Sequence, residues 1–303
     1  MPACDRHGVD VQQPSFDNDR DDRLDDFHCR TVTFHGAARA VYVSGTGPAV
    51  IVMAEMPGIS PDVARFARWV RDAGLTVYMP SLFGRDGAYP EAEAGRAVFK
   101  RACVSAEFRA FGGGAESPVA DWLRALAALA HRECGGPGVG AVGMCFTGNF
   151  ALTMMLEPSM LAPVLCQPSL PLDNPAGLEI SPEDLASVRE VLDRENLVVR
   201  AYRFEGDRFC TAARFAAYAD ALGPRFEPRV LSAAAANPAP PPFFEQFVGC
   251  AHSVVTAHLI DAEGEPTAAV RDEIIAFLIE TLADKGAGPQ RSGDVAQENS
   301  NHD

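Results

Sequence analysis

Short apolar runs alternate along the chain with longer segments in which apolar residues recur every three or four positions. The short runs are rich in Val and Ile and predict buried strands, whereas the longer segments predict amphipathic helices. The predicted strands are 38–44, 49–54, 75–79, 139–143, 163–166, 197–204 and 227–231. The predicted helices are 61–73, 91–111, 118–132, 146–156, 182–192, 212–222 and 267–283. This alternation predicts the α/β class, with a mostly parallel central sheet covered by helices on both faces.

Composition changes sharply at both ends of the chain. Residues 1–27 carry eight Asp and three Arg with almost no apolar periodicity, which predicts a disordered acidic tail. Residues 285–303 are polar and contain Gly, which predicts a second disordered tail. Residues 28–284 contain no internal repeat and form one predicted domain, and the Ala/Pro segment 232–242 is predicted to be a surface loop within it.

The charge of the chain excludes some classes of partner. A formal net charge of −15 argues against binding to a nucleic-acid backbone, which needs clustered Lys and Arg. Residues 134–156 are uncharged, but their Gly and Pro residues favour a strand followed by a helix over a membrane span. Residues 1–27 lack the apolar region of a signal peptide. We therefore expect a cytoplasmic protein, a monomer or homodimer, that acts on a small molecule.

None of the eight cysteines has the spacing of a zinc-ligand cluster, so we expect no metal and reduced thiols. One of them, Cys145, lies between a predicted strand and a predicted helix in Gly143-Met144-Cys145-Phe146-Thr147-Gly148. A nucleophile elbow occupies this position, because a sharp turn lifts its side chain clear of the sheet. The N-terminus of the following helix favours a thiolate. The alternative is a buried cysteine in a tight packing turn.

Two further loops supply an acid and a base in the order nucleophile, acid, histidine. Asp207 follows the strand 197–204, and it could instead be a turn residue or a helix cap. His252 alone among the seven histidines follows the last strand in a Gly-containing loop, although it could lack a partner. Because parallel strands place such loops at one edge of the sheet, we predict that the three residues form a triad.

Together, residues 50–58, the Gly143 elbow, the Gly206-Asp207 loop and the His252-Ser253 loop resemble the dienelactone hydrolase family. The resemblance implies an α/β-hydrolase fold with Cys145 as nucleophile, His252 as base and Asp207 as the residue that orients it. It also implies that Glu55 lies beside the resting thiol and controls its protonation. A carboxylate directly after an apolar strand could instead pair with an Arg.

The same resemblance implies an oxyanion hole formed by the backbone N–H groups of Met56 and Phe146. The sequence departs from the family pattern at two positions. Thr147 replaces a Gly of the elbow, where it could crowd the turn or add a hydroxyl near the nucleophile. Thr256 stands where the lactone enzymes place an Arg that holds the substrate carboxylate. The other candidates for that role follow the strand 75–79: Arg85, Arg96 and Arg101.

These patterns predict a cofactor-free hydrolase of a small-molecule ester or lactone that acts through an acyl intermediate on Cys145. The alternative is a thiol-based binding or redox-sensing protein of the same fold without efficient turnover. Because Thr256 cannot form the bidentate, charge-assisted contact of an Arg, we expect neutral substrates to be preferred over carboxylated ones.

Overall fold

A computed structural model describes residues 20–104 and 117–283. Its central element is an eight-stranded sheet in the order β1-β2-β4-β3-β5-β6-β7-β8. The strands are β1 (His28–Phe34), β2 (Ala37–Gly45), β3 (Ala49–Met53), β4 (Thr76–Pro80), β5 (Val139–Met144), β6 (Met160–Cys166), β7 (Val199–Phe204) and β8 (Phe226–Leu231). Strand β2 runs antiparallel to both β1 and β4, and all other neighbours are parallel.

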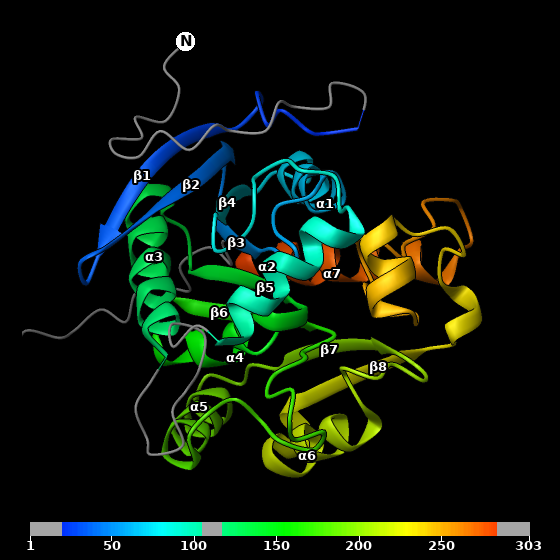
Figure 1. The fold of residues 1–303 in the computed structure, drawn as a ribbon. Coiled ribbons are helices and arrows are strands. Elements are labelled where there is room, and N and C mark those ends of the chain that lie inside the picture. The colour runs from blue at the N-terminus through cyan, green and yellow to red at the C-terminus, as the bar shows by residue number, and fades with distance from the viewer. Residues whose placement is uncertain (1–19, 105–116, 284–303) are drawn as a thin grey trace, which may run out of the picture.

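Helices cover both faces of the sheet (Figure 1). They are α1 (Pro61–Asp72), α2 (Ala92–Val104), α3 (Pro118–Cys134), α4 (Phe150–Thr153), α5 (Pro182–Arg194), α6 (Ala212–Leu222) and α7 (Pro266–Leu282). Alternate residues of β3 point into two separate cores, because successive side chains of a strand face opposite sides. Ile51 packs in the core that contains helix α3, and Val52 packs in the core that contains α1 and α7. The predicted α/β-hydrolase architecture is therefore confirmed.

The predicted helix 146–156 is interrupted in the structure. A 3₁₀ turn, η2 (Cys145–Thr147), follows β5 directly, and α4 begins only at Phe150. A second 3₁₀ turn, η3 (Met154–Leu156), ends the segment. The tight turn at Cys145 therefore delays the regular helix that the apolar pattern predicts.

The beginning of the described chain differs from the prediction of a disordered tail up to residue 27. Leu24 and Phe27 are buried, and they pack in the same core as α1. Asp22 and Asp26 accept hydrogen bonds from the Arg68 guanidinium, with N–O distances of 2.6 and 2.7 Å. Two buried apolar side chains and two ion pairs thus attach residues 20–27 to the folded domain. Residues 1–19 and 285–303, the remainder of the two predicted tails, lie outside the described residues.

The sequence prediction also missed strand β1. Its alternation of Thr31, Val32, Thr33 and Phe34 is typical of a strand, and a two-residue turn with positive φ at His35 and Gly36 joins it to β2. Because the pair extends the sheet at the edge farthest from β8, this omission does not affect the predicted position of the site.

Candidate active site

Cys145 lies in a sharp turn at the carboxyl end of β5. Its φ is +55°, a left-handed conformation that is unusual for a residue with a side chain and typical of a nucleophile elbow. The flanking glycines are required by close backbone contacts. A Cβ on Gly143 would lie 2.2 Å from the Thr147 carbonyl oxygen, and one on Gly148 would lie 2.7 Å from Pro168 Cα. The residue types on both sides of Cys145 therefore follow from the geometry of the turn.

The hydroxyl of Thr147 points away from the nucleophile and into the backbone. Its Oγ1 accepts from the Met144 N–H at 2.8 Å and lies 3.0 Å from the Met53 carbonyl oxygen, to which it can donate. Thr147 is completely buried. Its side chain links the end of β3 to the turn after β5, so this departure from the family pattern neither crowds the turn nor adds a group at the thiol.

Asp207 and His252 form a buried pair at the same edge of the sheet. The distance from His252 Nδ1 to Asp207 Oδ2 is 2.7 Å. The other oxygen of Asp207 accepts from the N–H groups of Phe209 and Cys210, at 2.9 and 3.1 Å. These contacts fix the carboxylate and leave Nδ1 as the donor of the imidazole, so that Nε2 faces away from Asp207.

His252 interacts with Cys145 as well as with Asp207. Within the described part of the chain, His252 Nε2 has no conventional hydrogen-bond partner. Burial alone would lower the pKa of His252, but the negative charges of Asp207 and Cys145, together with hydrogen bonding to both, raise that pKa well above 6.5. Cys145 is itself buried, with 8% of its surface exposed, and its charge acts on the buried His252. This arrangement favours the imidazolium form of His252.

Glu55 follows β3 and is buried at the centre of a polar cluster. The hydroxyls of Ser253 and Thr256 donate to its two oxygens, and Gln167 Nε2 donates to Oε2 at 3.2 Å. Burial raises the pKa of Glu55 to about 7, although the two hydroxyl bonds and the charge of His252 oppose this effect. No Arg among the described residues pairs with Glu55, so the alternative of a buried salt bridge is wrong.

Sequence reasoning missed Gln167 and Ser253 as members of this cluster. Gln167 comes directly after β6, and Glu55 comes two residues after β3. A polar residue at the end of an apolar strand was the signal that could have identified Gln167. Its Oε1 accepts from the Val254 N–H at 3.3 Å. The cluster therefore holds the segment that follows His252 against the ends of β3 and β6.

The four predicted substrate-binding residues are not brought together. Thr256 is fully buried and bonded to Glu55, which corrects its prediction as a substrate contact. Arg85 forms an ion pair with Asp21 at 2.6 Å. Arg96 is exposed on α2 with its guanidinium 5.6 Å from the centre of the Phe247 ring, and Arg101 is exposed on the same helix. The structure gives no contact between any of these arginines and the triad.

The two residues predicted to form the oxyanion hole follow neighbouring strands: Met56 follows β3, and Phe146 follows β5. Phe146 is the second residue of η2, where a helical N–H has no carbonyl acceptor in the preceding turn. Met56 follows Glu55 at the end of β3 and is buried. Phe146 also packs edge-on against Phe99 of α2, with 5.4 Å between ring centres, so α2 covers this side of the elbow.

The redox state of the cysteines differs from the prediction at one position. Cys29 is disulfide-bonded, which contradicts the expectation that every thiol is reduced. The free cysteines of the described residues are Cys103, Cys134, Cys145, Cys166, Cys210 and Cys250.

Within residues 20–104 and 117–283, no group of side chains has the composition of a metal site. No helix in those ranges is both long and apolar enough to cross a membrane.

The strand order and the elbow at the end of β5 are those of the α/β-hydrolase fold. The model of the dienelactone hydrolase family matches residues 35–169. The carboxymethylenebutenolidase of Pseudomonas sp. (strain P51) is 32% identical over 124 residues, which are 40% of this chain and 50% of that protein. The match thus spans about half the length of this relative. The expected resemblance to the dienelactone hydrolase family is confirmed.

Solved structures share the fold over most of the chain. A protein of Klebsiella pneumoniae subsp. pneumoniae MGH 78578 with the dienelactone hydrolase designation is 16% identical, with a TM-score of 0.56 over 84% of this chain and 98% of its own. The dienelactone hydrolase of Anabaena variabilis ATCC 29413 is 14% identical, with a TM-score of 0.51 over 84% and 98%. At these identities the likeness establishes the fold alone.

Proposed function

We propose that this protein hydrolyses esters or lactones through a covalent acyl intermediate on Cys145. The observation that carries the proposal is the elbow conformation of Cys145 at the sheet edge where the buried Asp207–His252 pair lies. The family match ends at residue 169, so it includes Glu55 and Cys145 but neither the acid nor the base. The geometry of the second half of the chain therefore supports the triad independently of the family match.

The proposed reaction has two steps. The Cys145 thiolate attacks the substrate carbonyl carbon while His252 holds the proton, and the N–H groups of Met56 and Phe146 stabilise the negative oxygen. His252 then protonates the leaving alcohol as the carbon–oxygen bond breaks and a thioester forms. In the second step, His252 takes a proton from water, hydroxide attacks the thioester, and the acid and Cys145 are released. Asp207 keeps Nδ1 protonated throughout.

The charges around the site support a neutral substrate. The hydroxyl that replaces the family's Arg, Thr256, is already bonded to Glu55, and Arg85 is already paired with Asp21. Above pH 7 Glu55 adds a negative charge to the site. We expect a higher kcat/KM for the methyl ester of a dienelactone carboxylate than for the free acid. A clear preference for the free acid would contradict this and would direct attention to Arg96 and Arg101.

The decisive experiment measures turnover of a panel of lactones and p-nitrophenyl esters by the wild type, Cys145→Ala and Cys134→Ala. We expect Cys145→Ala to lose more than about a thousandfold in kcat and Cys134→Ala to retain wild-type activity. Mass spectrometry after acid quenching should find the acyl group on Cys145. Full turnover by Cys145→Ala would overturn the mechanism. Reversible oxidation of Cys145 without turnover of any ester would instead support the thiol-sensing alternative.

A further inference from the structure

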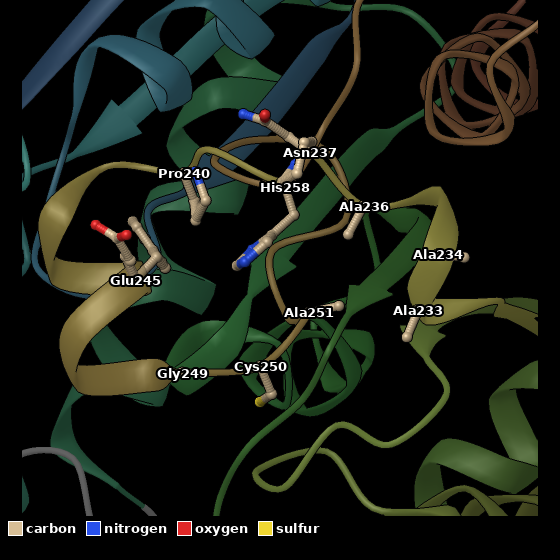
Figure 2. Close-up of a pocket in the computed structure, with 12 residues that line it drawn as sticks. Ala233, Ala234, Ala236, Asn237, Pro240, Glu245, Gly249, Cys250, Ala251 and His258 are labelled. Atoms are coloured by element: carbon tan, nitrogen blue, oxygen red, sulfur yellow. The ribbon is translucent and has the colours of Figure 1, made fainter.

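A hollow lies beside the loop that carries His252, with a volume of about 420 Å³ (Figure 2). It is lined by residues of the segment after β8, of the π-helical turn η6 (Phe244–Val248) and of the loop that follows it. Cys145, Asp207 and His252 are not among its lining residues. Its volume lies within the range of small-molecule sites, which is about 300–1,000 Å³.

One wall of the hollow is formed by small or rigid residues and is held in place by the backbone. The lining residues of this wall are Ala233, Ala234, Ala236, Asn237, Pro238 and Pro240. The Asn237 N–H donates to the His258 carbonyl at 2.9 Å, and its side-chain amide donates to the Ala257 carbonyl at 3.2 Å. Figure 2 shows the Asn237 amide directed away from the hollow. The wall is therefore mainly apolar and preformed.

His258 supplies the polar group inside the hollow. It is only 4% exposed, and its ring packs edge-on against Phe244 with 5.9 Å between ring centres. Its Nδ1 accepts from the Ser253 N–H at 3.2 Å, so the proton of the neutral ring is on Nε2. Burial, assisted by the charge of His252, lowers the pKa of His258 to about 4, and the ring is therefore neutral at pH 7.

The Nε2–H of His258 is available to a ligand. Figure 2 shows the ring pointing into the hollow from its inner side. Among the described residues, Nε2 has no hydrogen-bond partner. This donor is not among the buried polar atoms that lack a partner, so it reaches the open space of the hollow and can bond a ligand that carries a matching acceptor.

The charges at the rim restrict the ligand further. The ionised residue that lines the hollow is Glu245, which is exposed, and no Lys or Arg is among the described lining residues. A carboxylate ligand would be repelled by Glu245, and no lining Lys or Arg in the described part of the chain would offset this repulsion. An ammonium group placed against His258 would face the Nε2–H donor. Two donors cannot form a hydrogen bond with each other, so this ligand class is disfavoured.

We propose that this hollow binds a neutral, largely apolar molecule whose carbonyl oxygen accepts a hydrogen bond from His258 Nε2. The apolar part of the ligand packs against Phe244 and the alanine wall. The site is separate from the triad, and the proposal does not depend on hydrolysis.

The ketone 6-propionyl-2-(dimethylamino)naphthalene is a suitable probe, because its emission shifts to shorter wavelength in an apolar site. We expect saturable binding to the full chain. Ala236→Phe fills the hollow and should abolish binding, whereas Ala235→Phe adds the same ring at a position that does not line the hollow and should leave the Kd within twofold. Binding that is unchanged in Ala236→Phe would overturn the proposal.

A second pair of variants tests the hydrogen bond. His258→Asn keeps an acceptor near Nδ1 for the Ser253 N–H but removes the donor from the hollow, and it should weaken binding about tenfold. His258→Gln places an amide donor near Nε2 and should weaken binding less. Tighter probe binding by His258→Asn than by His258→Gln would refute the role of His258 as the donor.

Two further measurements locate the probe and test its charge. Alkylation of Cys145 with iodoacetamide should leave probe binding unchanged, and loss of binding would place the probe in the catalytic site and overturn the proposal. In competition, 2-acetylnaphthalene should displace the probe, whereas 2-naphthoate, its carboxylate counterpart, should not. Equal displacement by both would contradict the proposed selection for neutral ligands.

Discussion

Replacing Glu55 with Gln should remove a pH-dependent destabilisation of the fold. Glu55 is buried within bonding distance of the Ser253 and Thr256 hydroxyls and the Gln167 amide. A Gln side chain has nearly the same shape and can both accept from and donate to hydroxyl groups. The substitution therefore keeps the packing and abolishes only the ionisation.

The magnitude follows from the pKa of Glu55. Desolvation raises that pKa from 4.5 to about 7, so the folded protein holds the proton more tightly than the unfolded chain does. The contribution of Glu55 to stability is therefore fully present below pH 4.5 and is lost as the pH rises through 7. At about 1.4 kcal/mol per pKa unit, the total change is about 3 kcal/mol. About 2 kcal/mol of it falls between pH 5.5 and pH 8.

Urea unfolding of the wild type and Glu55→Gln at several pH values measures this effect. The free energy of unfolding of the wild type, relative to that of the variant, should fall by about 2 kcal/mol from pH 5.5 to pH 8. Groups that ionise independently of Glu55 cancel in this difference. Glu263→Gln, at an exposed position, controls for the loss of one charge. A difference that does not change with pH, or that grows with pH, would refute the reasoning.

Three other substitutions or modifications test the site. Limited alkylation with iodoacetamide, read by mass spectrometry, should label Cys145 before Cys166, because burial raises the pKa of the Cys166 thiol; equal labelling would contradict a specially reactive nucleophile. Asp207→Asn should lower kcat by about 10³–10⁴-fold in an ester assay, because the imidazole loses its orienting acceptor, and an unchanged kcat would exclude Asp207 from the triad. Thr147→Val should lower the free energy of unfolding by about 1–3 kcal/mol in urea, because the Met144 N–H loses its acceptor, and a neutral effect would show that this bond is dispensable.

The interior of the fold was predictable because buried strands and helices differ in the period of their apolar residues. Helix α6 has the predicted bounds, and β3 differs from its prediction by one residue. Ser60 and Ser181 cap α1 and α5, each accepting from the N–H three residues ahead. At the edge of the sheet, the strand β1 alternates polar and apolar residues and was missed. Residues 20–27 were missed because ion pairs and two apolar anchors leave no periodic pattern.

The position of the candidate site was predictable from topology, but its internal contacts were not. Loops after parallel strands meet at one sheet edge, which is why Asp207 and His252 could be paired from their order alone. The function of a hydroxyl depends on which backbone groups it faces, and that information is three-dimensional. Thr147 and Thr256 were therefore identified as departures without a correct account of their contacts. His258 was overlooked because the hollow exists only after two segments have folded together.

The buried residues at the start of the described chain have a practical consequence for anyone who shortens this protein. A chain that begins at residue 28, where composition alone would place the boundary, loses Leu24 and Phe27 from the core around α1. It also leaves Arg68 without the two carboxylates that it contacts. Such a truncation would expose an apolar surface beside α1, and exposed apolar surface promotes self-association. The shortest soluble version should therefore retain residues 20–27.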